Sequence, residues 1–385
     1  MQVKIKAKHL LHPFRSVSMV KNRIVGRVSI LQCARRAQRL YSRDLRYNMQ
    51  SVVDGYTSRI TDSIDDTALL KRICAAYKPA LANASSPGLY RPTGWWEEVR
   101  RSNLGPVMRA LAAEDTVALQ EMYRNFFRDA CSAGLLIRAI DTSVANQCHF
   151  ILGDALYRVD HWQEMVGDDF ILADLQVPEI GNPFGVRIDG TFVRGGSEYQ
   201  HYCAERVFRL VPDGAGRVAE IGGGYGGAAF YLLRDHSAVR YVNFDLPETI
   251  ALNSYYLVKT LPQRSFVLYG EEASSDPAAR KFDVALMPAQ ELRSLAPKSI
   301  DVTFSSHAIS DLSTDALCEY LQQICRITAG HFLYIGNAAA GAKLTTLVEG
   351  RFPALALAES RESSWHKFRD PGAKEVELLF RSREH

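Results

Sequence analysis

Val218-Ala219-Glu220-Ile221-Gly222-Gly223-Gly224-Tyr225-Gly226-Gly227 is the stretch of sequence that decides the fold. Its first four residues predict a buried strand, and its glycines predict a tight turn that opens a helix. Glycine adopts positive φ and lets a ligand approach the backbone closely. The N-terminus of the following helix adds oriented N–H groups. The stretch therefore predicts a strand, a glycine turn and a helix that together hold a ligand.

The next predicted strand ends in an acid, about two dozen residues further on, in Asn243-Phe244-Asp245-Leu246-Pro247. An acid at the end of the second strand of such a unit is well placed to hold ribose hydroxyls. We therefore expect a nucleoside to lie between the glycine turn and Asp245.

The glycines alone do not choose the nucleotide, because Gly222, Gly224 and Gly227 also fit the G-x-G-x-x-G pattern of dinucleotide binders. Glu220 turns the pattern into E-x-G-x-G-x-G, which places an acid for the amino-acid part of S-adenosylmethionine. The sequence has only one such unit, with no second mononucleotide-binding unit. We predict an S-adenosylmethionine site that includes Glu220, Gly222, Gly224, Gly226 and Asp245; an NAD-dependent oxidoreductase and a cofactor-binding protein without catalysis are the alternatives.

The last part of the chain, residues 212–385, alternates apolar strand candidates with helices, which is typical of a parallel sheet covered on both faces. Its final two strands have no helix between them, and this favours an antiparallel closing hairpin on a Rossmann-like methyltransferase sheet. The expected strands are Val218–Ile221, Tyr241–Phe244, Phe266–Leu268, Ile300–Phe304, Phe332–Ile335, Ala354–Ala358 and Glu375–Phe380. The expected helices are Gly227–Arg234, Glu248–Thr260, Thr314–Ile327 and Ala342–Glu349.

Residues 61–211 have apolar residues at three- and four-residue intervals and predict a mainly helical substrate or lid region. Asp189-Gly190 predicts a small hairpin within 186–194. The expected helices are Thr67–Leu81, Trp95–Ala113, Thr116–Ala133, Ser143–Val166 and Glu198–Leu210.

Residues 1–60 form a basic arm: residues 1–50 contain twelve Lys or Arg and one acid, Asp44. Apolar residues recur at helical spacing from Val17 to Leu31. Three interpretations stay open: an amphipathic helix on an anionic membrane surface, a helix packed on the protein or a partner subunit, and a transit peptide. A nucleic-acid enzyme would spread positive charge around its cleft, so we expect no nucleic-acid partner.

The composition is that of a soluble globular protein, with 47% hydrophobic and 23% charged residues. No apolar run approaches the ~20 residues of a membrane-spanning helix, and no secretion signal is recognisable. The seven scattered cysteines predict free thiols in a reducing compartment and no zinc site. We expect a cytoplasmic protein, with a peripheral contact at the inner face of the membrane left open by the basic arm, and a homo-oligomer is compatible with this composition.

Several motifs resemble those of the bacterial sugar O-methyltransferase family. The glycine turn resembles its first motif, and Asp245-Leu246-Pro247-Glu248 resembles its second. The resemblance covers about residues 88–335 and also rests on Tyr90–Trp96, Gly181–Pro183, Asp189-Gly190, Leu286–Gln290 and Ile300–Ser306. The family usually has Glu-Met where this chain has Asp311-Leu312.

The resemblance implies methyl transfer from S-adenosyl-L-methionine to a sugar hydroxyl, on a glycan, a nucleotide sugar or a glycosylated metabolite. It also implies that Leu246, Met287 and Ser305 lie at the cofactor, with Met287 and Pro288 beside the adenine. An O-methyltransferase of a non-sugar metabolite is the nearest alternative, and a non-catalytic assembly protein is another.

His307 is the predicted general base. It follows the Ile300–Phe304 strand, and ligands of such sheets bind beyond the carboxyl ends of the strands. An unperturbed histidine pKa of ~6.5 suits proton removal near neutral pH. Asp311, four residues on, would orient His307 if the loop is helical, or would itself be the base.

Other candidates come from aromatic residues. Tyr199, His201 and Tyr202 precede the first strand and either close over the cofactor or pack in the core. Trp95 and Trp96 either offer a stacking face to a sugar or lie buried. The acids are too dispersed to nominate a metal site, and metal dependence stays open.

Overall fold

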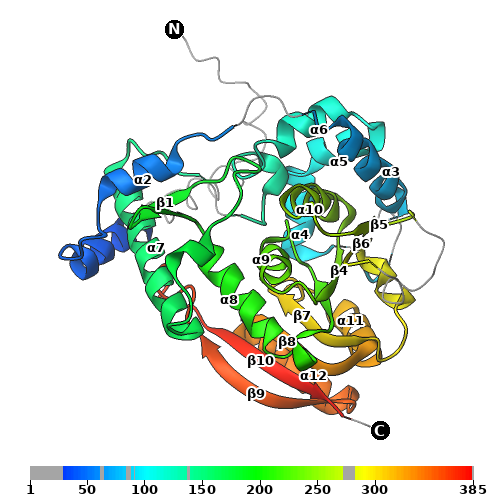
Figure 1. Cartoon of the computed structure of the whole chain (residues 1–385). Coiled ribbons are helices and arrows are strands. Elements are labelled where there is room, and N and C mark those ends of the chain that lie inside the picture. Colours follow the sequence, from blue (N-terminus) through cyan, green and yellow to red (C-terminus); the bar gives the residue numbers. More distant parts are fainter. Residues whose placement is uncertain are drawn as a thin grey trace, which may run out of the picture.

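An eight-stranded sheet forms the centre of the molecule (Figure 1). The computed structural model describes residues 29–60, 65–83, 88–90, 92–136, 139–271 and 282–383. From one edge the strand order is β5 (Phe266–Leu268), β6 (Val284–Pro288), β4 (Arg240–Asp245), β3 (Arg217–Ile221), β7 (Ile300–Ser306), β8 (Thr328–Asn337), β10 (Glu375–Ser382) and β9 (Leu355–Ser363).

The first six strands in this order are parallel, and β10 runs antiparallel to both β8 and β9. From β6 to β8 the order follows the 3-2-1-4-5 sequence of nucleotide-binding sheets. The predicted Rossmann-like fold with an antiparallel closing hairpin is therefore confirmed. Phe266–Leu268 forms the outer edge, because the fully buried strand Val284–Pro288 takes the inner place beside β4.

Helices cover both faces of the sheet. Successive side chains of a strand point to opposite faces, and the inner strands are buried at successive positions, as in β3 and β6. On one face Val218 joins the core formed with α8 (Ser197–Phe208), α9 (Gly227–Asp235) and α10 (Pro247–Thr260). On the other face Ala219 and Ile221 pack with α11 (Thr314–Ile327) and α12 (Ala338–Arg351).

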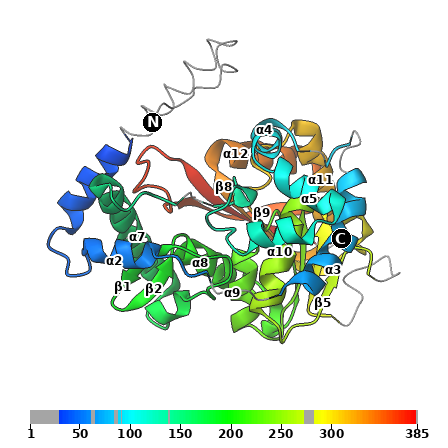
Figure 2. The same ribbon diagram turned by 90° about the horizontal axis from the view of Figure 1, so that it is seen from above.

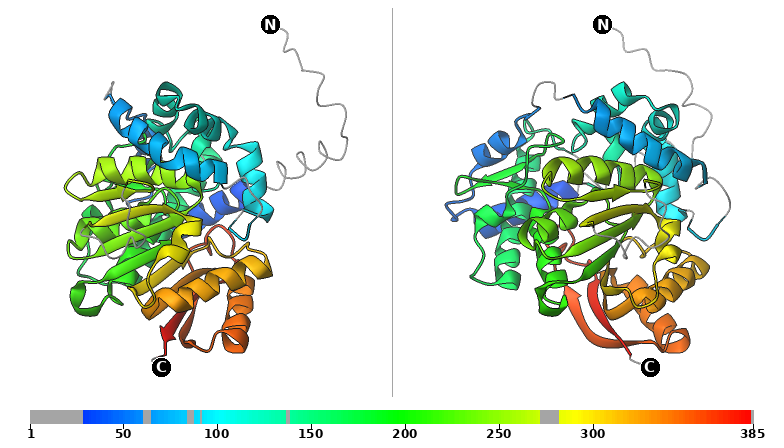
Figure 3. Two further views of the ribbon diagram at one scale, coloured as in Figure 1. Left: turned by 90° about the vertical axis from the view of Figure 1, so that its right-hand side faces the viewer. Right: turned by 45° about the vertical axis from the view of Figure 1, so that its right-hand side comes forward.

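The N-terminal helices add a further layer outside α10 (Figure 3). They are α3 (Thr67–Asn83), α4 (Gly94–Ser102), α5 (Gly105–Ala113) and α6 (Thr116–Tyr123). Tyr77 of α3 is fully buried, and its hydroxyl bonds Ser254 Oγ at 2.8 Å and the Leu286 carbonyl at 3.1 Å. The single helix expected over 95–113 is two helices, because Pro106 suits the first turn of a new helix better than a helix interior.

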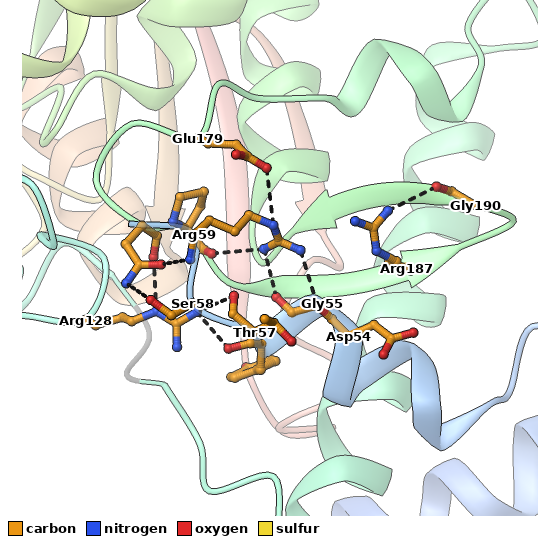
Figure 4. Close-up of polar contacts among 12 residues, drawn as sticks. Asp54, Gly55, Thr57, Ser58, Arg59, Arg128, Glu179, Arg187 and Gly190 are labelled. Carbon is orange, nitrogen blue, oxygen red and sulfur yellow. Dashed lines mark hydrogen bonds and ion pairs between the residues drawn. The ribbon is translucent and has the colours of Figure 1, made fainter. Parts of the chain in front are cut away.

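A second group of N-terminal elements packs beside α8 and consists of α2 (Met49–Tyr56), α7 (Ala145–Val166), β1 (Gly185–Ile188) and β2 (Thr191–Arg194). The β1–β2 hairpin turns at Asp189 and Gly190, both at positive φ (48° and 79°), as the sequence predicts. Figure 4 shows Arg59, which follows α2, bonding the Gly55 carbonyl and pairing with Glu179 at 3.4 Å.

Part of the basic arm, residues 1–28, lies outside the described residues, and so does most of its predicted amphipathic pattern. Residues 29–41 are helical, and Cys33 and Ala37 pack there against Phe368. Among the described residues, no helix is both long and apolar enough to cross a membrane.

Candidate functional site

The glycine turn after β3 is joined to the end of β4 by three hydrogen bonds that its backbone N–H groups donate. The Gly222 N–H donates to the Phe244 carbonyl at 2.8 Å, the Gly223 N–H to Asn243 Oδ1 at 3.1 Å, and the Gly224 N–H to Asp245 Oδ2 at 2.9 Å. Gly222, Gly224 and Gly226 have φ of 75°, 58° and 96°. The turn therefore needs glycine at these three positions.

Asp245 closes β4 at the same edge of the sheet. Its Oδ1 accepts the Leu246 N–H at 2.7 Å, and its Oδ2 accepts the Gly224 N–H. Burial raises the pKa of Asp245 to about 7, and the two N–H bonds oppose that rise. The carboxylate is thus fixed between the glycine turn and the start of α10.

A cleft of about 660 Å³, partly open to solvent, lies over this edge of the sheet. Four segments meet in it: the glycine turn, the end of β4, the turn after β7 and the N-terminal segment that leads into α4. The residues that line it are Tyr90, Pro92, Thr93, Trp96, Leu135, Ile221, Gly222, Gly224, Phe244, Asp245, Leu246, Ala289, Ala308, Ile309, Asp311, Leu312 and Tyr320. The cleft brings together Gly222, Gly224, Asp245, Leu246 and Asp311 from the predicted site. His307 is not among its lining residues, although the next residue, Ala308, is.

The cleft lies where the order of the sheet reverses. β3 is followed by α9 on one face, and its neighbour β7 is followed by α11 on the other. Loops that leave in opposite directions from adjacent parallel strands open a crevice beyond the carboxyl ends, which is the usual ligand site of these sheets.

Glu220, Ser305 and Met287 lie behind the cleft wall. The buried carboxylate of Glu220 accepts a hydrogen bond from the Tyr241 hydroxyl, and burial raises the pKa of Glu220 to about 7. Ser305 Oγ donates to the Ile221 carbonyl at 3.0 Å. Met287 is buried beside Phe244. All three support the strand ends from which the cleft residues project.

Tyr202 and His201 lie away from the cleft. The Tyr202 hydroxyl donates to Glu377 Oε2 of β10 at 2.6 Å. His201 is buried and accepts a hydrogen bond from Trp162 Nε1 at 3.2 Å. Tyr199 is nearer to the site, since its hydroxyl bonds Ser306 Oγ at 2.7 Å. Gly226 does not line the cleft. It is the N-cap residue of α9.

His307 lies at the end of β7, with φ of 61°, and its N–H donates to the Ile335 carbonyl of β8 at 2.8 Å. Its Nε2 is buried without a hydrogen-bond partner and lies 3.7 Å from Glu375 Oε1. Burial lowers the pKa of His307, and the Glu375 carboxylate partly opposes this effect. The burial of the ring therefore favours its neutral form.

His307 and Asp311 occupy different sides of one turn. The Ser310 N–H donates to the His307 carbonyl at 3.0 Å, which gives a turn and not the helix that would stack the two side chains. Asp311 is exposed on the cleft wall, whereas the His307 ring packs near Tyr199 and His366. Glu375, and not Asp311, is the carboxylate beside His307 Nε2.

The N-terminal segment contributes aromatic residues to the cleft. The Tyr90 hydroxyl donates to Glu319 Oε1 at 2.9 Å, and its ring meets Tyr320 of α11 edge-on at 5.0 Å. Trp96 lies on the wall and Trp95 is 51% exposed, with their rings 4.9 Å apart. Figure 2 shows α4, which carries both tryptophans, beside α11. The sequence marked Tyr90 only as part of a motif and Trp96 as either a stacking face or a buried residue; their position over the cleft depends on tertiary packing.

Two groups in the described part of the chain place three potential metal-ligating atoms within 4.8 Å of one another: His307, His366 and Glu375, and His201, Glu205 and Asp235. Ordinary pairing accounts for the first group, because Glu375 Oε2 bonds His366 Nδ1 at 2.7 Å and its Oε1 faces His307.

Comparison with known proteins gives matches among solved structures only. No protein-family model matches the chain, and no curated protein matches it. Magnesium protoporphyrin IX methyltransferase from Synechocystis, solved with bound S-adenosylmethionine, is 13% identical, with a TM-score of 0.35 over 60% of this chain and 97% of that one. A TehB-like S-adenosylmethionine-dependent methyltransferase from Corynebacterium glutamicum is 17% identical, with a TM-score of 0.33 over 47% of this chain and 87% of that one.

A third similar structure, an S-adenosylmethionine-dependent methyltransferase from Aquifex aeolicus, is 14% identical, with a TM-score of 0.33 over 47% of this chain and 89% of that one. The functional assignment rests on the residues of the cleft.

Proposed function

We propose that this protein is an S-adenosylmethionine-dependent methyltransferase that methylates a hydroxyl group of a sugar. The observation that carries the proposal is the cleft in which Gly222, Gly224 and Asp245 meet at the reversal point of the sheet. A nucleoside needs an acid for its ribose, an apolar slot for its base and exposed backbone for its polar tail, and this cleft offers all three.

The residues present fit the cofactor. Asp245 Oδ1 and Oδ2 each accept one N–H, and each keeps a lone pair for a ribose hydroxyl. Leu246, Ala289 and Ile309 form an apolar wall beside Asp245 that suits an adenine. The glycine turn leads into the N-terminus of α9, whose partial positive charge suits a carboxylate.

The closing strands favour this cofactor over a dinucleotide. A dinucleotide-binding sheet has two similar halves, and in its 3-2-1-4-5-6 order a parallel strand lies next to the fifth strand. Here β10 is antiparallel to β8, and only one glycine turn precedes an acid-ended strand. NAD is accordingly the disfavoured ligand.

When bound, S-adenosylmethionine supplies an electrophilic methyl group on a sulfonium whose leaving group is a neutral thioether. The chain must align the acceptor oxygen with that methyl carbon and take the hydroxyl proton. His307 is the proposed base. Because its Nε2 faces Glu375, the neutral ring keeps its proton on Nε2 and leaves Nδ1 free to accept the proton of the acceptor.

Asp311 and Trp96 support the sugar as acceptor. Asp311 is a carboxylate on the cleft wall that can accept sugar hydroxyls, or can act as the base in place of His307. Trp96 offers an aromatic face, which stacks on the C–H surface of a sugar ring. The resemblance to sugar O-methyltransferases provides the remaining support.

The proposal is tested by incubating the full chain with labelled S-adenosylmethionine and a panel of free sugars, nucleotide sugars, glycosylated metabolites and phenols. Label in a sugar methyl ether is the expected result. Label only in a phenol would assign a non-sugar acceptor, and cofactor binding without any transfer across the panel would favour a non-catalytic role.

A further inference from the structure

A second cavity lies between α7, the β1–β2 hairpin and the start of α8, and its walls contain several buried charged side chains. They are Asp154, Arg158, Arg194, Glu198 and Arg369. All except Arg369 are less than a tenth exposed. The space between these side chains measures about 500 Å³ and is partly open to solvent. Charges in such a position require partners, because an isolated buried charge is costly.

The charges in this cavity are not matched one to one. Arg369 pairs with both oxygens of Asp154, with Nε–Oδ1 at 2.8 Å and Nη2–Oδ2 at 2.5 Å. Arg158 Nε is 3.7 Å from Glu198 Oε2, too far for a hydrogen bond. Arg194 forms no ion pair with any described residue. Three arginines thus face two carboxylates, an excess of one positive charge.

Arg194 carries this excess. Its Nη1 donates to the Gly195 carbonyl at 2.7 Å, and its Nη2 donates to Gln200 Oε1. The guanidinium lies over the rings of Phe127 and Tyr225, 5.4 and 5.5 Å from their centroids. Dipoles and ring faces therefore stabilise the charge without neutralising it.

Two donors of the cavity have no acceptor: the Nε atoms of Arg158 and Arg194 are buried without hydrogen-bond partners. We propose that this cavity binds a small anionic group, a carboxylate or a phosphate, between Arg158 and Arg194. Oxygen atoms there would accept from both Nε groups and neutralise the excess charge, which is the bonding that guanidinium groups form best.

Glu198 is compatible with an anion in the cavity. Its Oε2 accepts the Gly196 N–H at 3.0 Å, and its Oε1 is buried without a hydrogen-bond partner, so a protonated Oε1 can donate to the anion. Burial raises the pKa of Glu198 above its usual range, which weakens its opposition to a second negative charge.

The cavity is connected to the glycine turn through one side chain. Gln200 Oε1 accepts from Arg194 and also accepts the Tyr225 hydroxyl at 2.7 Å. Tyr225 belongs to the turn between Gly224 and Gly226. An anion that fixes the position of Arg194 would therefore also fix Gln200, which bonds Tyr225 of the glycine turn.

The test is a measurement of anion binding by the purified full chain, without S-adenosylmethionine and without any transfer reaction. Thermal unfolding is followed at constant ionic strength with chloride, acetate or inorganic phosphate, and then with glucose, glucuronate or glucose 6-phosphate. A rise in Tm of ~2 °C or more with acetate or phosphate over chloride is expected at saturation. Because no cofactor is used, failure here leaves the methyltransferase proposal untouched.

The measurements with glucose, glucuronate and glucose 6-phosphate show whether the anion is a free ion or part of a sugar. If glucuronate or glucose 6-phosphate binds at least ~10-fold more tightly than acetate or phosphate, and glucose does not bind, the anionic group belongs to a sugar, as a carboxylate or a phosphate ester. Equal affinities would assign a free ion. The proposal is overturned if neither acetate nor phosphate raises the Tm of the wild-type protein over its value in chloride.

Arg194→Gln is the diagnostic variant, and Arg187→Gln on the same hairpin is its control. Arg187 is exposed, and among the described residues its one hydrogen bond is to the Gly190 carbonyl at 3.5 Å (Figure 4). The anion-dependent shift should disappear in the first variant and persist in the second. Wild-type anion affinity in a folded Arg194→Gln protein would also overturn the proposal.

Discussion

The Gly224 N–H donates a hydrogen bond to Asp245 Oδ2 across 2.9 Å, which joins the glycine turn of β3 to the acid that ends β4. These residues are separated along the chain by a whole helix, and the parallel pairing of β3 with β4 brings them together. The bond thus joins two segments that line the proposed cofactor cleft.

Affinity for S-adenosylhomocysteine should rise with pH because of Asp245. Burial raises the pKa of this carboxyl to about 7, and the ionised form is the better acceptor for ribose hydroxyls. Between pH 6 and pH 8 we expect a ~10-fold gain in affinity, measured by calorimetry, as the group loses its proton. Asp245→Asn should show weak, pH-independent binding, and Asp283→Asn, near the amino end of β6, should behave as wild type. A flat profile in the wild type would count against the ribose role.

Gly222→Ala should abolish cofactor binding. A Cβ at Gly222 would lie 2.0 Å from the Ala308 Cβ on the opposite cleft wall, so the wall must move. Gly190→Ala is the matched control, since Gly190 has nearly the same φ (79° against 75°) but nothing within 4 Å of the added carbon. Both variants should lose ~1 kcal/mol of stability through backbone strain, and Gly222→Ala should lose more because of the overlap with Ala308. Only Gly222→Ala should lose affinity by ~10²-fold or more, and equal affinities in the two would refute the steric argument.

His307→Ala should lower the rate of methyl transfer by at least ~10²-fold while S-adenosylhomocysteine still binds. His331→Ala, on β8, should leave the rate unchanged. Because burial lowers the pKa of His307, the wild-type rate should rise with pH through a value below 6.5 and then stay level. A variant that keeps the wild-type rate would leave Asp311 as the remaining candidate base.

Glu220 should make the protein less stable as the pH rises from about 5 to 8. Burial raises its pKa from 4.5 to about 7, so over this interval the folded state holds a proton that the unfolded chain has already lost. Stability therefore falls until the pH passes 7, by on the order of 3 kcal/mol for this group. Urea unfolding should show a smaller loss in Glu220→Gln, and Glu349→Gln, exposed on α12, should match the wild type. An unchanged loss in Glu220→Gln would contradict the buried, protonatable state.

The sequence predicted the sheet well because its signals are local. Glycine at positions 222 and 224 permits the positive φ that this turn requires, and an apolar strand ending in Asp245 follows at the spacing of one helix. The antiparallel hairpin was likewise visible, since no helix separates its two strands.

The parts that sequence did not predict depend on contacts between distant segments. Glu375 lies beside His307 because β10 pairs with β8, a contact that spacing within the 307–311 turn cannot indicate. Tyr90 reaches the cleft by packing on Tyr320, and the charged cavity around Arg194 draws on α7, α8 and the segment after β9. Helix breaks at Pro106 were missed because the apolar periodicity continues across them.

Calorimetric titration of the full chain with S-adenosylhomocysteine and, separately, with NAD⁺ is the most direct measurement of the central claim. One molecule of S-adenosylhomocysteine should bind per chain with a Kd in the micromolar range or below, and Asp245→Ala should weaken this by ~10-fold or more. NAD⁺ should give no heat. Binding of NAD⁺ in competition with the nucleoside, or no binding of S-adenosylhomocysteine at all, would contradict the assignment.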